Sequence, residues 1–107
     1  MNTTITVTKQ VTTLINILTV EPENQQKLIE LLRDSTKNVV SKLGGWISTS
    51  FIAANDERHV VIYSQWSDLA SVEAMQSNPE MVAYFPRVAA IAAFDNFAGH
   101  VVYNHHA

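Results

Sequence analysis

The first half of the chain changes from a continuous apolar run to an amphipathic segment with helical spacing. Residues 11–20, VTTLINILTV, are β-branched and apolar with little polar alternation, which predicts a strand covered on both faces. Pro22 suits the first turn of a helix, and apolar residues then recur every three or four positions. Gly44 and Gly45 come next, and glycine is typical of a helix end. We therefore expect a strand at 11–20 and a helix that continues to residue 43.

The middle of the chain has the pattern of a hairpin. Residues 46–54, WISTSFIAA, and residues 58–66, ending in YSQW, are rich in strand-forming residues. The polar stretch between them, NDER, is typical of a turn. In the second of these strands Val60, Ile62, Ser64 and Trp66 alternate with His59, Val61, Tyr63 and Gln65, so each set shares one face. Both faces carry apolar residues, which predicts that both are covered.

Helix-starting and helix-breaking residues dominate the segment after Trp66. Ser67 and Asp68 are candidate caps for a helix from 69 to about 76, and Asn78 with Pro79 predicts a new helical start. Pro86 should break or kink that helix, because proline lacks the backbone donor. We expect one or two further helical turns in RVAAIAAF and a last strand at 97–103.

These elements have the order β-α-β-β-α-β, which predicts an α+β fold of the ferredoxin-like type with a four-stranded antiparallel sheet. We expect residues 11–107 to form a single domain, with residues 1–10 as an N-terminal tail or an extra edge strand. Helices cover one side of such a sheet. The other side would remain apolar and uncovered unless a second copy packs on it.

Composition supports this expectation of a homodimer. The chain has 107 residues, of which 47% are hydrophobic and only 16% are charged. So few charges on a small domain indicate that part of its surface lies in an interface between subunits. The net charge of -3, without a lysine or arginine cluster, argues against nucleic acid as a partner.

The chain has no cysteine, which excludes disulfides, thiolate metal sites and a cysteine nucleophile. Its start lacks the pattern of a signal peptide, and its longest apolar run is too short to cross a membrane. We therefore expect a cytoplasmic protein without a membrane partner. The four histidines have no zinc-binding spacing, and we expect no metal site; His105 and His106 fit a solvated tail, and His100 is expected within the last strand.

Two features keep an enzyme in consideration. Asn16 lies in an otherwise apolar strand, where its amide either bonds the backbone or donates into a cavity. Four aromatic residues lie at the ends of predicted elements, where they pack in the core or line a pocket for a flat ligand: Trp46, Trp66, Tyr84 and Phe85.

With these residues in place, the sequence resembles the antibiotic biosynthesis monooxygenase family, which consists of small dimeric α+β-barrel proteins. The resemblance covers residues 11–103 and rests on INILTV, LGGWISTSF, VVIYSQWSD, SNPEM and RVAAIAAF, of which YSQW with its adjoining helix is the most specific. It implies an O2-using monooxygenase without metal or flavin, acting on an electron-rich aromatic such as a quinol or anthrone.

The resemblance also implies roles for individual residues. Trp66 matches a strand-end tryptophan of the family pocket and Asn16 a polar residue that faces the pocket. These two are the candidate catalytic residues. The candidate substrate contacts are Trp46, Ile62, Tyr84, Phe85 and Arg87.

One position departs from the family pattern and keeps alternatives open. Ile62 stands where polyketide oxygenases carry an asparagine, so a hydrogen bond to substrate is lost unless Asn16, Ser64 or Arg87 supplies it. A dimer that only binds a small ligand is the first alternative. A haem-degrading monooxygenase is the second, although the histidine that those relatives use is missing near residues 84–87.

Overall fold

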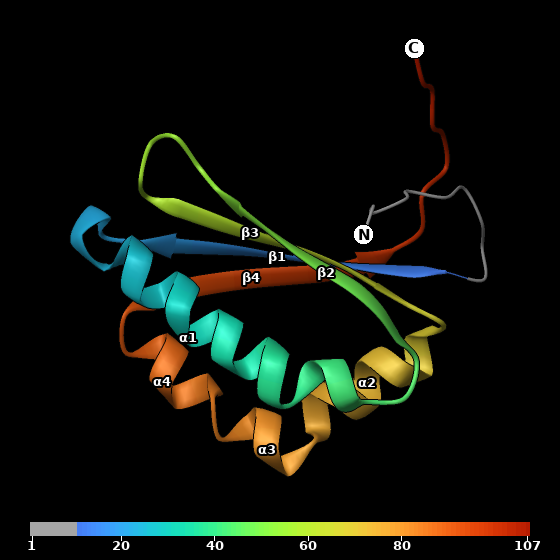
Figure 1. Ribbon diagram of the computed structural model, residues 1–107, viewed down its shortest axis with the longest axis horizontal. Coiled ribbons are helices and arrows are strands. Elements are labelled where there is room, and N and C mark those ends of the chain that lie inside the picture. Colours follow the sequence, from blue (N-terminus) through green and yellow to red (C-terminus); the bar gives the residue numbers. More distant parts are fainter. Residues whose placement is uncertain (1–10) are drawn as a thin grey trace.

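In the computed structural model, which describes residues 11–107, one sheet carries all helices on one face (Figure 1). The expectation for residues 1–10 lies outside the described residues. The strands are β1 (Thr12–Val20), β2 (Trp46–Ala53), β3 (His59–Trp66) and β4 (Ala92–Gly99). The helices are α1 (Gln25–Asn38), α2 (Leu69–Ser77), α3 (Pro79–Val82) and α4 (Phe85–Ala89), with 3-10 turns η1 (Pro22–Asn24) and η2 (Val40–Lys42).

The sheet has the strand order β2-β3-β1-β4, and all neighbours are antiparallel. This order confirms the predicted ferredoxin-like α+β fold. The register places Leu14 beside Ser64 and Asn16 beside Ile62, so these residues share the face that the helices cover. The predicted alternation of β3 is thereby confirmed, because Val60 and Trp66 belong to the same face.

Two predicted boundaries are wrong. The helix does not continue to residue 43: α1 ends at Asn38, because Val39 leaves helical dihedral angles (φ -125°, ψ -65°). Val39 and Val40 are then both buried, so the break turns two valines into the core.

The last strand lies at Ala92–Gly99 and not at 97–103, and His100 comes after it. The alanine-rich run favours a helix locally, but pairing with β1 extends along eight residues, from Val20–Ala92 to Thr13–Gly99. Long-range strand pairing therefore decides this segment.

The helix starts agree with the sequence. The Asn78 side chain accepts hydrogen bonds from the backbone N–H groups of Glu80 and Met81, at 2.9 and 3.3 Å. Pro86 lies in the first turn of α4 and separates it from α3. The predicted interruption at Pro86 is thus confirmed.

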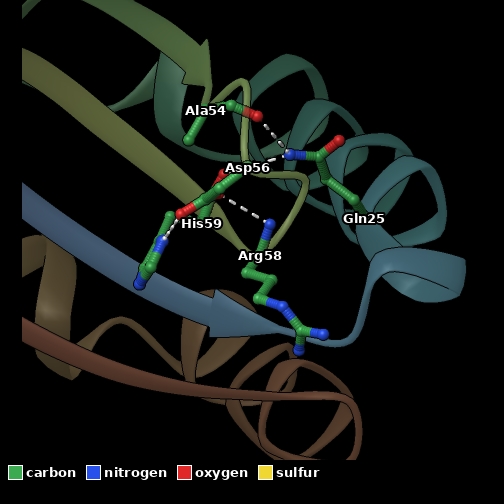
Figure 2. Close-up of polar contacts among 5 residues, drawn as sticks. All are labelled: Gln25, Ala54, Asp56, Arg58 and His59. Atoms are coloured by element: carbon green, nitrogen blue, oxygen red, sulfur yellow. Dashed lines mark hydrogen bonds and ion pairs between the residues drawn. The ribbon is translucent and has the colours of Figure 1, made fainter.

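The tip of the β2–β3 hairpin is tied to α1 and to itself (Figure 2). Gln25 Nε2 donates to the carbonyl oxygens of Ala54 and His59, at 3.3 and 3.1 Å. Asp56 accepts from the backbone N–H of Arg58 at 2.8 Å and contacts His59 Nδ1 at 2.7 Å; these two hydrogen bonds, the first the larger, lower the pKa of the Asp56 carboxyl. The arrangement fixes the hairpin and leaves His59 on the opposite sheet face from the helices.

The turn between η2 and β2 requires glycine at one of its two positions. Gly45 has φ of +84°, and a Cβ there would collide with the Ser71 side chain and lie 2.8 Å from Ser67 Oγ. Gly44 has open space around the equivalent position.

We expect Gly45→Ala to lower the free energy of unfolding by about 1–3 kcal/mol or more, because left-handed backbone strain and a collision add. Gly44→Ala is the matched control and should change it far less. Urea unfolding at fixed protein concentration measures both. Equal losses would contradict this assignment.

The start of α2 is held by a charged cap. The Asp68 carboxylate accepts from the backbone N–H and the hydroxyl of Ser71, at 2.8 and 2.7 Å. These bonds, the hydroxyl bond first, lower the pKa of Asp68 below its ordinary value of 3.8.

A lowered pKa in the folded state means that the cap stabilises the protein fully above the unfolded-state pKa. The stabilisation is lost as the pH falls through the lower, folded-state pKa. We expect Asp68→Asn to unfold with a weaker pH dependence between about pH 5 and 2, measured as midpoints of thermal unfolding. An unchanged dependence would show that the Asp68 charge does not matter.

Candidate functional site

A cavity of about 400 Å³ lies between the helix-covered face of the sheet and the helices. Strands β1, β3 and β4 form its floor, and residues from α1 to α4 and from η2 close it. Its lining is mostly apolar: Leu14, Leu18, Leu32, Val40, Ile62, Met75, Met81, Phe85, Val88 and Phe94. Six polar residues complete it: Asn16, Ser35, Ser64, Gln76, Tyr84 and Asn96. Size and composition suit a small aromatic ligand.

The two serine hydroxyls in the lining are already used within the protein. Ser35 Oγ donates to the carbonyl oxygen of Leu32 at 2.9 Å. Ser64 Oγ donates to the carbonyl oxygen of Leu14 at 3.4 Å and accepts from the indole of Trp66 at 3.1 Å. A ligand would have to compete with these bonds.

The other four polar side chains of the lining are free to bind a ligand. Within residues 11–107, no hydrogen bond involves the side-chain amides of Asn16, Gln76 and Asn96 or the hydroxyl of Tyr84. Asn16 is partly buried, and the polar groups of such a residue need a partner. These four groups therefore determine which polar substituents the cavity accepts.

Among residues 11–107, no carboxylate, histidine, lysine or arginine lines the cavity. No group of three or more possible metal ligands occurs among residues 11–107 either. The lining thus lacks a strong base for neutral pH, and a substrate that ionises there must have acidic protons of its own.

The structure places the predicted site residues in two groups. Asn16, Ile62, Tyr84 and Phe85 line the cavity together. Trp66, Trp46 and Arg87 are not part of its lining.

Trp66 lies behind the cavity wall. It is only 1% exposed and packs in a cluster with Leu14, Val72 and Met75. Its indole N–H reaches the cavity only through Ser64 Oγ. Any effect of Trp66 on a ligand is therefore exerted by positioning Ser64 and β3.

Trp46 and Arg87 are also outside the cavity lining. The Trp46 side chain packs against the same cluster, and its indole donates to Thr49 Oγ1 at 2.8 Å. The Arg87 guanidinium lies 5.1 Å from the ring centre of Tyr84 and borders a shallow surface groove with Lys27 and Glu30. Its cation–π contact holds the tyrosine from outside.

The sequence interpretation missed Phe94, Gln76 and Asn96. Phe94 and Asn96 were missed because the last strand was predicted too late in the chain. The sequence pattern puts residues 92–96 in a helical turn and a connection. The alternation in AAFDNFAG, once paired with β1, puts Phe94 and Asn96 on the cavity face.

Comparison with known proteins gives two kinds of similarity. A family model described as "Antibiotic biosynthesis monooxygenase" matches residues 12–87. The tetracenomycin-F1 monooxygenase of Streptomyces glaucescens is 33% identical over 73 residues, which are 68% of this chain and 65% of that protein. The match therefore spans slightly less than two thirds of the relative.

Solved structures share the fold at low sequence identity. A mutant of SnoaB from Streptomyces nogalater, a cofactor-independent oxygenase, has a TM-score of 0.75 at 13% identity, covering 89% of this chain and 96% of that one. The ActVA-Orf6 monooxygenase of Streptomyces coelicolor, in complex with nanaomycin D, has a TM-score of 0.77 at 18% identity. The match covers 84% of this chain and 86% of that one. A putative antibiotic biosynthesis monooxygenase from Nitrosomonas europaea has a TM-score of 0.78 at 13% identity. The match covers 92% of this chain and 97% of that one. None of the described helices is long and apolar enough to cross a membrane.

Proposed function

Because this chain belongs to the antibiotic biosynthesis monooxygenase family, we propose that it oxygenates an electron-rich aromatic quinol or anthrone with O2, without a metal or organic cofactor. The observation that carries the proposal is the apolar cavity of about 400 Å³, whose free polar groups are three amides and one phenol. One relative is named for tetracenomycin F1 and another was solved with nanaomycin D, which supports a small organic substrate here.

The proposed chemistry begins with loss of an acidic proton from the bound substrate. The resulting carbanion, delocalised onto oxygen, passes one electron to O2, and the two radicals combine to a peroxide. The peroxide takes up a proton and loses water, which converts the attacked ring carbon (CH2 in an anthrone, CH in a quinol) into C=O. One oxygen atom thus enters the product and the other leaves as water. The protein contributes position, exclusion of water and hydrogen bonds to the developing oxyanion.

Each predicted residue has a place in this proposal. Asn16 donates its amide N–H to the substrate oxyanion, while Ile62, Tyr84 and Phe85 contact the ring. Trp66 positions Ser64. Trp46 and Arg87 do not contact the substrate in this proposal. Trp46 packs on the core cluster, and Arg87 holds the ring of Tyr84 in place.

The alternative function is binding of a small apolar ligand without turnover. It is favoured by a cavity to which none of residues 11–107 contributes a carboxylate or a histidine. Haem degradation would need an iron ligand, and no histidine of residues 11–107 lines the cavity.

Oxygen uptake separates oxygenation from binding. Metal-free protein is mixed with a panel of anthrones and hydroquinones, and O2 consumption is recorded against the uncatalysed rate. Turnover on at least one substrate supports oxygenation. Binding of the same compounds without any added O2 consumption, in folded protein, would favour the binding function instead.

We further propose a homodimer formed through the sheet face opposite the helices. Ile17, Ile52 and Phe97 lie on this face and are 39%, 54% and 57% exposed. A sheet face with three exposed large apolar side chains suits an interface with a second copy.

Sedimentation equilibrium tests the dimer. Wild type should sediment at twice the chain mass, and Ile52→Lys should weaken association, because a charge would enter the interface. Glu30→Lys on the exposed side of α1 is the control that also adds a lysine. A monomeric wild type at micromolar concentration would contradict the proposal.

A further inference from the structure

Two asparagine side chains lie next to each other in the cavity floor. Asn16 of β1 pairs directly with Asn96 of β4, and both line the cavity. Directly opposite residues on antiparallel strands have Cβ atoms about 4.5–5.5 Å apart. The floor of the cavity thus presents two carboxamides side by side.

The hydrogen-bonding capacity of this pair is unused within residues 11–107. Each carboxamide has two N–H donors and an oxygen acceptor, and neither makes a side-chain hydrogen bond there. Asn16 is partly buried and Asn96 is exposed, so the pair extends from the cavity interior to its mouth.

The neighbours of the pair restrict what it can bind. On the other side of Asn16, the residue in register is Ile62, which offers no hydrogen bond. Phe94 lies two residues before Asn96 on the same face and adds an aromatic surface to the cavity. A ring that packs on Phe94 would have its polar edge at the two carboxamides.

The lack of charge in the cavity lining restricts the ligand further. Because no cationic or anionic side chain of the described part of the chain lines the cavity, a permanently charged group would lose its hydration without a counter-charge. Hydroxyl and carbonyl groups match the pair better, since a carboxamide both donates to and accepts from them.

We infer that Asn16 and Asn96 together bind two neighbouring oxygen substituents on one edge of an aromatic ligand. One oxygen bonds Asn16 in the interior, and the other bonds Asn96 at the mouth. This inference deepens the proposed function and rests on it for the aromatic class of the ligand. Asn96 is thereby a specificity-determining residue.

The test compares two probes that differ by one oxygen, 2,3-dihydroxynaphthalene and 2-naphthol. Titration calorimetry is done without O2, so that binding is measured apart from turnover. Wild type should bind the diol about threefold to tenfold more tightly, which corresponds to one additional hydrogen bond.

Asn96→Leu keeps the side-chain size and removes the amide. It should abolish the preference for the diol and leave the Kd for 2-naphthol within about twofold. Thr19→Val, on the opposite face of β1, is the control and should keep the preference. A wild type without preference, or an Asn96→Leu variant that keeps it or loses affinity for both probes alike, would overturn the inference.

Failure of this inference is distinguishable from failure of the proposed function. If the diol preference depends on Asn96 but no substrate raises O2 consumption, the carboxamide pair stands and oxygenation is refuted. If O2 consumption is found and the diol preference does not depend on Asn96, oxygenation stands and the pair is refuted.

Discussion

Trp66→Ala is expected to lower the free energy of unfolding by about 3–5 kcal/mol, the range for deleting a large buried aromatic side chain. Trp66 is the largest fully buried residue, and it belongs to one core cluster with Val72 and Met75 of α2 and Met81 of α3. Its loss would also leave Ser64 Oγ without its indole donor. Urea unfolding at fixed protein concentration measures the change.

Two further variants make this prediction specific. Trp46→Ala should cost clearly less, because that side chain is only partly buried. Trp66→Phe retains most of the packing and provides a folded protein if the alanine variant does not fold. Equal losses for Trp46→Ala and Trp66→Ala would contradict a dominant role of Trp66 in the core.

Asn16→Leu is expected to reduce kcat for oxygenation by about 10²- to 10³-fold, as removal of a single oxyanion donor does in other enzymes. The effect is large because most of the surrounding lining is apolar. Steady-state O2 consumption with the best substrate of the panel measures it.

The control for this variant is Thr19→Val, on the same strand and the opposite face. It should retain the wild-type kcat. Asn16→Leu protein that is folded and turns over at the wild-type rate would exclude Asn16 from oxyanion stabilisation and leave it a structural residue of β1.

Helix starts and breaks could be predicted from neighbouring residues alone. The cap at Asn78 and the interruption at Pro86 result from hydrogen bonds and φ restrictions within a few residues. The alternation of β3 predicted which residues share a face, and the register with β1 shows which of the two faces the helices cover. It did not predict how deeply Trp66 is buried, because that depends on how α2 packs over it.

The position of the last strand could not be predicted from local sequence, because pairing with β1 determines it. The alanines around Ile91 favour a helix, yet β4 starts at Ala92 because its partner β1 fixes the register. Because the last strand was predicted at 97–103, Phe94 and Asn96 were not among the predicted site residues. Asn16 was identified because it is a polar residue in a segment whose strand character was clear. Ile62 was identified only through the resemblance to the family.

Ile62 and Asn96 lie on either side of Asn16 and differ in their capacity for hydrogen bonds. The β3 residue next to Asn16 is the apolar Ile62, and the β4 residue on the other side of Asn16 is Asn96, which has a free carboxamide. A shift of hydrogen bonding from one neighbouring strand to the other would change the substrate orientation while the apolar walls remain. This gives a structural reason to test substrates with different oxygen patterns.

The most direct measurement of the central claim is isotope incorporation under ¹⁸O2 by chelator-treated protein with its best anthrone or quinol substrate. Cofactor-free monooxygenation predicts one ¹⁸O atom per product molecule, formed above the uncatalysed rate and at a much lower rate in Asn16→Leu. Product without ¹⁸O, or no product above the uncatalysed rate from folded protein, would contradict it.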